Sequence, residues 1–279
     1  NRKIIDPIAN RDFFLDELAR RGREEMMKIL QEEGFSVISP SPEDTRFGVV
    51  ETWQDAKKCA ALFKENQEKI DGIIVSLPNF GDEKAVANTI RLSGLDVPIL
   101  VHAFPDNLNT MDLPHRRDSF CGKMSVCNNL RQYGIPFTNT TYHTCPIESQ
   151  VFLADLDFFA RVCRVVNGLR NARIGAIGAR PAAFQTVRYS EKLLQAAGVT
   201  VVPVDLSEII FAAQRLRDDD PAVQAKLEEV RAYGTIPDYV PNENVLKQAR
   251  LSVAIDRWMD ENECDASAIE CWDSIQKNY

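Results

Sequence analysis

A single carboxylate near the end of the sequence stands where acid–base or metal chemistry could take place. Glu270 ends the short apolar run that begins at Ala268, and polar residues follow it. In an open α/β sheet, ligands bind outside the carboxyl ends of the strands, so an acid at such an end is a candidate for chemistry. The alternative is an ordinary exposed acid that pairs with Lys277 or Arg257.

A glycine-containing loop is the second candidate. The segment from Gly175 to Pro181 follows an apolar run and precedes a helical pattern, a position where backbone N–H groups can face an anion or a sugar hydroxyl. It lacks both the GxGxxG spacing of a dinucleotide site and the GK[ST] of a P-loop, so a substrate-facing loop, a nucleotide site and a structural turn all stay open. Within or just after it, Arg180, Phe184 and Gln185 could together hold a polyhydroxylated ligand, although each alone could be an ordinary surface residue.

All three histidines fall between positions 102 and 143, with three cysteines nearby, but their spacing fits no compact zinc pattern. His102 ends an apolar run, His115 lies in a polar loop and His143 lies at a junction between units. We therefore interpret His102 and His115 as candidate substrate contacts, with a subunit contact as the alternative.

One further acid, Asp205, follows the apolar run 199–204, and Ser207 is placed to cap the next helix. A ribose-binding acid would occupy a similar position. Without the glycine fingerprint, the sequence favours capping.

The composition excludes several classes of function. Acidic residues outnumber basic ones by 41 to 33 and no basic block offsets the net charge of -8, which argues against nucleic acid and anionic membrane surfaces as partners. The seven cysteines form no CxxC pair, which indicates reduced thiols in a cytoplasmic protein. No apolar run approaches the roughly 18 residues of a membrane helix, and the polar start at Asn1 is not typical of a signal peptide.

The elements that must position these residues follow an alternating pattern. Short apolar runs rich in β-branched residues alternate with amphipathic segments, which predicts βαβ units and a parallel sheet covered on both faces. We expect two tandem Rossmann-like, doubly wound α/β domains with mainly parallel sheets, over residues 1–145 and 146–279. The expected strands are 35–39, 72–77, 98–103, 136–142, 173–177, 199–204 and 266–271, and the expected helices include 11–33, 53–70, 151–169, 189–197 and 242–261.

The start of the first domain departs from this pattern. The first clear element is the helix 11–33, and no strand is apparent before it. Because such a domain normally begins with a central strand, we expect residues before Asn1 to be missing.

Three segments of the sequence resemble a known family. They are Asp118 to Phe137 (DSFCGKMSVCNNLRQYGIPF), Arg173 to Glu191 (RIGAIGARPAAFQTVRYSE) and Ala268 to Ser274 (AIECWDS). Together they resemble the L-fucose isomerase and L-arabinose isomerase superfamily, above all its fucose-isomerase-like members. The resemblance covers nearly the whole chain.

The resemblance implies an aldose–ketose isomerase with two Rossmann-like domains and a third, largely β domain. Family members bind a divalent metal, commonly Mn²⁺, through two carboxylates and a histidine, and they assemble as trimers or hexamers. Their active site lies between the second and third domains, with help from a neighbouring subunit's first domain. Glu270 matches the first metal-binding carboxylate, which also takes part in proton transfer. The other two ligands are expected beyond Tyr279, so we expect this chain to lack the β-rich catalytic domain and to be inactive alone.

These residue types suit isomerisation through an ene-diol. A base removes the proton α to the sugar carbonyl and an acid returns it to the neighbouring carbon, while a hard cation polarises the carbonyl. We therefore expect a metal-dependent isomerase acting on a monosaccharide as a homo-oligomer. A non-catalytic sugar-binding module and a purely structural role in assembly remain the alternatives, and the sequence does not identify the sugar.

Overall fold

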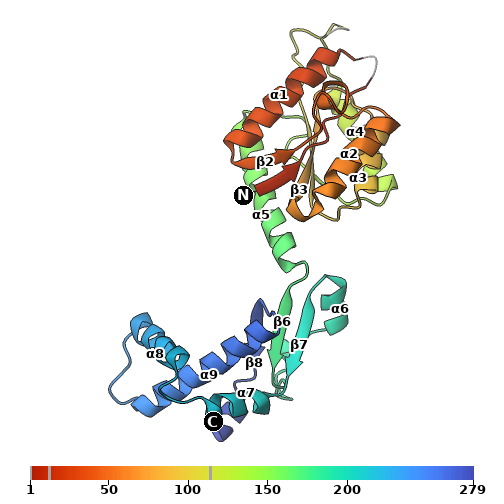
Figure 1. The fold of residues 1–279 in the computed structure, drawn as a ribbon. Helices are drawn as coiled ribbons and strands as arrows, with labels where there is room; N and C mark the ends of the chain where they lie inside the picture. Colours follow the sequence, from red (N-terminus) through yellow and green to blue (C-terminus); the bar gives the residue numbers. More distant parts are fainter. Residues whose placement is uncertain (1, 12–13, 113–114) are drawn as a thin grey trace. The chain divides into compact units, whose positions relative to one another are not determined.

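The computed structural model describes residues 2–11, 14–112 and 115–279, and the chain forms two compact units, Asn1–Asn167 and Gly168–Tyr279. Each unit is built on its own parallel sheet (Figure 1), which confirms the predicted α/β fold class. Three parts of the sequence lie outside the described residues: Asn1, residues 12–13 of the expected helix 11–33, and residues 113–114 just before His115.

The first unit contains a five-stranded sheet in the order β2-β1-β3-β4-β5, and every adjacent pair of strands is parallel. Its strands are β1 (Arg2–Ile5), β2 (Phe35–Ile38), β3 (Gly72–Leu77), β4 (Ile99–Ala103) and β5 (Thr138–Asn139). Its helices are α1 (Asp16–Glu32), α2 (Trp53–Glu65), α3 (Glu83–Ser93), α4 (Ser119–Gln132) and α5 (Gln150–Leu169), with short 3₁₀ helices at Arg46–Gly48 and Gln67–Lys69.

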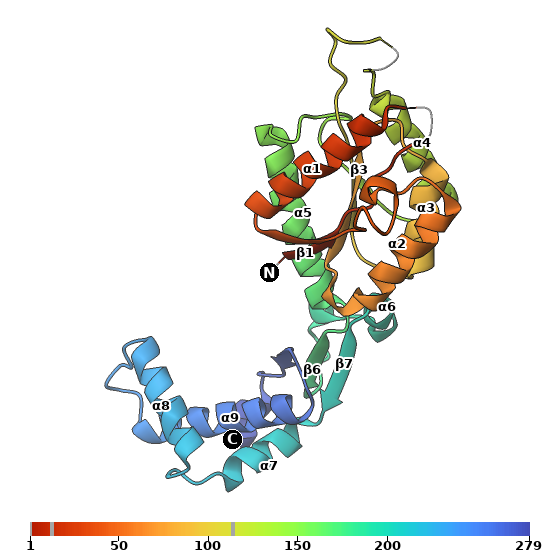
Figure 2. The same cartoon turned by 45° about the horizontal axis from the view of Figure 1, so that its top comes forward.

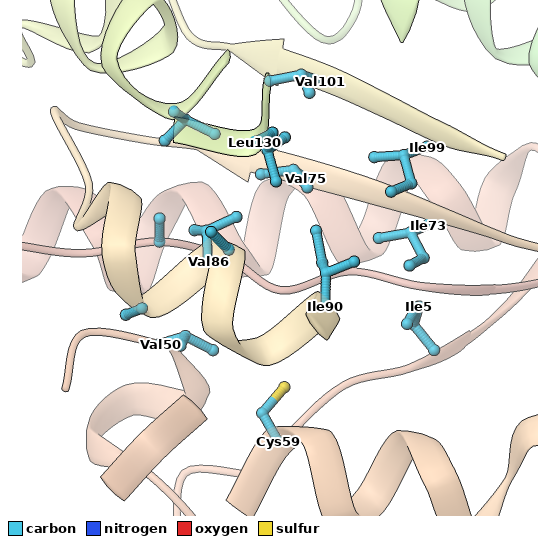
Figure 3. Close-up of a cluster of buried hydrophobic side chains, with 14 of the residues drawn as sticks. Ile5, Val50, Cys59, Ile73, Val75, Val86, Ile90, Ile99, Val101 and Leu130 are labelled. Atoms are coloured by element: carbon cyan, nitrogen blue, oxygen red, sulfur yellow. The ribbon is translucent and has the colours of Figure 1, made fainter. Parts of the chain in front are cut away.

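Helices cover both faces of this sheet, as the continuous apolar runs of β3 and β4 predict. Along β3, Ile73 and Val75 pack against α2, α3 and α4, whereas Ile74 packs against α1 and α5. Figure 2 shows the two groups of helices on opposite sides of β3, and Figure 3 shows the core on the α2–α4 side.

The expectation that no strand precedes the first helix is wrong. Residues Arg2–Ile5 form β1, which lies between β2 and β3. The strand was missed because its apolar part, Ile4 and Ile5, is only two residues long and Asp6 and Pro7 follow at once. Packing on both faces of the sheet stabilises this short strand, since Ile5 belongs to one core and Ile4 to the core on the opposite face.

The second unit contains a three-stranded parallel sheet in the order β7-β6-β8. Its strands are β6 (Arg173–Ile177), β7 (Thr200–Val204) and β8 (Ala266–Ile269). Its helices are α6 (Glu191–Ala196), α7 (Leu206–Arg215), α8 (Pro221–Tyr233), α9 (Asn242–Glu261) and α10 (Ser274–Asn278), with a 3₁₀ helix at Gln185–Val187.

Two helices cover one face of this smaller sheet. Ile177 of β6 packs against α7 and α9 through Ile209 and Leu251, and a separate apolar cluster joins α8 to α9. On the same face a side chain at Gly175 would collide with the Trp258 ring, at 2.6 Å from an added Cβ, so the glycine lets α9 lie close to the strand.

The long helix α5 lies within the second expected domain, 146–279, but it packs with the first unit. Phe152, Leu156 and Phe159 are buried beside Met26 of α1, and the units divide only after Asn167. The reason is that the apolar face of α5 packs, together with α1, on one face of the first sheet. Among the described residues, no helix is both long and apolar enough to cross a membrane.

Candidate functional site

Glu270 immediately follows β8, at the carboxyl end of the second sheet. The chain runs from β6 to β7 on one side and then crosses to β8 on the other side of β6, so the order of connections reverses between β6 and β8. In open α/β sheets, this reversal marks the crevice where ligands bind. The backbone N–H of Glu270 extends the ladder by donating to the carbonyl of Ile177, at 2.8 Å, which fixes the acid at that crevice.

Two hydrogen bonds orient the Glu270 carboxylate. Ala179 N–H donates to Oε2 at 3.2 Å, and Ser274 Oγ donates to Oε1 at 3.3 Å. A carboxylate offers about four lone-pair directions, so these two bonds leave capacity on both oxygens for a ligand or a metal ion. The side chain is half-buried, so it is reachable from solvent.

The surface ion pairs proposed as the alternative for Glu270 do not form. Lys277 pairs with Asp273, and Arg257 pairs with Asp220 at 3.1 Å. The carboxylate is thus held by one neutral N–H group and one hydroxyl.

The loop after β6 comes very close to this acid because it contains a glycine. Gly178 has φ +82°, in the left-handed region that favours glycine. A Cβ at this position would lie 2.8 Å from Glu270 Oε2 and 2.9 Å from Glu270 Cβ. Only glycine allows the loop and the carboxylate to approach this closely.

An open pocket of about 570 Å³ lies beside the carboxylate, within the range of about 300–1,000 Å³ that is usual for small-molecule sites. Residues from three segments line it, including Ala179 after β6, Asp205 and Ser207 after β7, and Glu270 and Ser274 after β8. Hydroxyl, amide and carboxylate groups therefore converge on one small volume, as recognition of a polyhydroxylated ligand requires.

Ser207 was expected to cap α7, whereas the residue that caps this helix is Asp205. Its Oδ1 accepts from Ser207 N–H at 2.8 Å and from Ser207 Oγ at 2.6 Å. These hydrogen bonds hold the pKa of the Asp205 carboxyl below its ordinary value. Capping is the role that the structure shows for this acid.

The three other candidates of the second unit differ in their contacts. Arg180 Nη1 donates to backbone carbonyls of its own loop, and the Phe184 ring lies 5.6 Å from that of Trp272, centroid to centroid. Gln185 is exposed at the start of the 3₁₀ helix. Their roles as sugar contacts stay predictions.

The two candidate histidines lie in the first unit. His102 has no exposed surface: its ring contacts Phe104 and Phe152, and its Nε2 donates to the carbonyl of Cys145 at 2.8 Å. Burial lowers the pKa of His102 to about 3, so the ring is neutral. The structure therefore favours a core role for His102 over the predicted substrate contact, because its ring cannot reach a ligand from this position.

His115 is exposed and pairs with Asp112, so it remains available for a contact at the surface of the first unit. All seven cysteines lie among the described residues, and all are free thiols. Across the residues that the structure describes, no group of three or more His, Cys, Asp and Glu side chains could hold a metal ion.

Sequence reasoning missed two groups that hold Glu270. The Ala179 N–H is a backbone donor, which no residue type reveals. Ser274 could have been found, because it lies four residues after Glu270, at the first position of α10.

The sequence is similar to a protein family and to curated proteins. Residues 7–170 match a family described as fucose/sulfoquinovose isomerase, N-terminal domain. Two curated proteins, from Priestia aryabhattai and Priestia megaterium (strain ATCC 12872 / QMB1551), are both named sulfoquinovose isomerase. Each is 24% identical to this chain over 267 residues, which make up 95% of the chain and 56% of the relative. The chain thus spans about half the length of the curated relatives that it matches.

Proposed function

We propose, because the chain belongs to the fucose/sulfoquinovose isomerase family, that the protein is a metal-dependent aldose–ketose isomerase that uses Glu270 as a metal ligand and proton carrier. The observation that carries the proposal is the position of Glu270. It lies at the carboxyl end of β8, in a crevice with a pocket beside it, and no cation pairs with its carboxylate among the described residues.

In the proposed isomerisation, Glu270 would accept one proton from the sugar and return it. Isomerisation moves a proton from C2 of an aldose to C1 and a second proton between the two oxygens. A carboxylate that accepts only two weak hydrogen bonds can turn one lone pair toward such a proton, and transfer of this kind typically contributes about 10² to 10⁴ in rate. Ala179 N–H and Ser274 Oγ would keep the carboxylate oriented while it does so.

A divalent cation such as Mn²⁺ would polarise the sugar carbonyl and stabilise the negative charge that develops on its oxygen. Carboxylate oxygen is a suitable ligand for such a hard cation, so Glu270 fits as one ligand. Among the described residues, Glu270 belongs to no group of three or more His, Cys, Asp and Glu side chains that could hold a metal ion. We therefore propose that residues outside this chain supply the remaining metal ligands and complete the active site.

The substrate proposed is a monosaccharide, with sulfoquinovose and fucose as the first sugars to test because the family description names both. We also propose a homo-oligomer. These statements concern the whole protein, of which this chain represents about half by comparison with its relatives.

The test is turnover by the full-length protein on L-fucose, L-arabinose, D-arabinose and sulfoquinovose, after removal of metal with EDTA and after return of Mn²⁺. We expect turnover of at least one sugar to be lost with EDTA and restored by Mn²⁺. Binding of a sugar with no turnover, unaffected by EDTA, would instead support a non-catalytic sugar-binding module.

A further inference from the structure

The loop after β6 is closed around a single guanidinium. Arg180 Nη1 donates to the carbonyl of Pro181 at 2.9 Å, and to those of Ala182 and Phe184 at 3.2 Å each. One nitrogen therefore binds the backbone carbonyls of three residues of the loop. Because a guanidinium is planar and always charged, it can hold carbonyls in a fixed arrangement in a way that an apolar side chain cannot.

Both ends of this loop contact the segment that carries Glu270. At the start, Ala179 N–H donates to Glu270 Oε2 at 3.2 Å. At the end, the Phe184 ring is tilted against the ring of Trp272, two residues after Glu270, with centroids 5.6 Å apart. The shape of the loop therefore determines where the carboxylate is held.

We infer that Arg180 is a positioning residue for Glu270, acting through the backbone of its own loop instead of contacting the sugar. This revises the sequence-based hypothesis for Arg180. Hydrogen bonds of an exposed side chain contribute little to the stability of a fold, so loss of the guanidinium should loosen the loop and leave the second unit folded.

Nuclear magnetic resonance on this chain tests the inference without any assay of activity. In Arg180→Met, we expect amide hydrogen exchange at Ala179 to accelerate about tenfold or more, because the N–H group is no longer held against Glu270. The indole resonance of Trp272, assigned with Trp272→Phe, should shift as the Phe184 ring moves away. Arg180→Lys keeps a charged donor and should restore most of both signals. The matched control is Arg188→Met, because Arg188 is an exposed arginine of the same segment.

A kinetic comparison on the full-length protein, with Mn²⁺ and whichever of the four sugars is turned over, rests on the proposed function. A displacement of Glu270 lowers kcat with little change in KM, by up to about 10²-fold for a shift of 1 Å. An Arg180→Met variant with unchanged Ala179 exchange and an unchanged Trp272 resonance overturns the inference, whether KM rises or not. If no sugar is turned over, the proposed function fails, and the resonance measurements still decide the role of Arg180.

Discussion

Glu270 carries the proposed chemistry because its surroundings leave it free to act. The two cations considered as its partners pair elsewhere, Lys277 with Asp273 and Arg257 with Asp220. Within the described part of the chain, a backbone N–H and a hydroxyl are the groups that donate to its oxygens. An acid neutralised by a salt bridge would be a poorer base and a poorer metal ligand. At this scale, sequence position indicated Glu270 as a candidate and could also have indicated Ser274, whereas the Ala179 N–H that orients the carboxylate is visible only in the structure.

A second acid, Asp6, is buried completely in the first unit and makes stability depend on pH. It follows β1, and its Oδ2 accepts from Ser76 Oγ at 3.0 Å while Oδ1 has no partner among the described residues. Burial raises the pKa of Asp6 from 3.8 to about 7, against the smaller lowering effects of Ser76 and Arg23.

Between pH 3.8 and about 7, the folded state therefore still holds a proton on Asp6 that the unfolded state has already released. Its contribution to stability is fully present below pH 3.8 and is lost as pH rises toward 7. One pKa unit corresponds to about 1.4 kcal/mol, so the loss is at most about 4 kcal/mol. In Asp6→Asn, urea unfolding followed by fluorescence should show a flatter pH dependence over this range. The control is Glu43→Gln, an exposed acid, which should keep the wild-type slope; an unchanged slope in Asp6→Asn would contradict the assignment.

At the scale of elements, the contact between the β6 loop and Glu270 depends on Gly178. Alanine there would have φ +82° and a Cβ 2.8 Å from Glu270 Oε2. We expect Gly178→Ala to destabilise the second unit by more than about 1 kcal/mol, because strain and collision add, and to lower turnover of the full-length protein by displacing the acid.

Gly198→Ala separates these two effects. Gly198 has φ +88° in the same unit, but an added Cβ would meet nothing closer than 3.5 Å. It should share the backbone strain and leave turnover close to wild type. Equal turnover of the two variants in the isomerase assay, with equal urea midpoints, would show that the close approach at Gly178 has no role.

Elements with long or strongly apolar patterns could be predicted from the sequence. β3, β4, β6, β7 and β8 lie within a residue or two of their expected bounds. β3 and β4 are buried throughout, and buried parallel strands have continuous apolar runs. β1 and the membership of α5 in the first unit could not be predicted, since both depend on contacts with distant segments. The same limit applies to the site. Residue types indicated Glu270, whereas the Arg180 loop is held by hydrogen bonds from Arg180 to backbone carbonyls, and a sequence does not show which carbonyls accept them.

At the scale of the whole molecule, the family match covers the first unit and the candidate acid lies in the second. The two units therefore supply different evidence, one for membership of a sugar isomerase family and the other for a site with suitable chemistry. The chain spans 56% of the length of the curated relatives, so the proposed isomerase activity is to be tested on the full-length protein.

The most direct test of the proposed function is turnover of the four sugars by the full-length protein carrying Glu270→Gln, compared with wild type and with Glu261→Gln in saturating Mn²⁺. Glu261 is an exposed acid at the end of α9, so its variant controls for loss of one negative charge. We expect Glu270→Gln to lose at least about 10²-fold in kcat, because the amide can neither accept the proton nor bind the cation as a carboxylate does, while Glu261→Gln stays near wild type. Wild-type turnover in Glu270→Gln would contradict the proposed role of this acid.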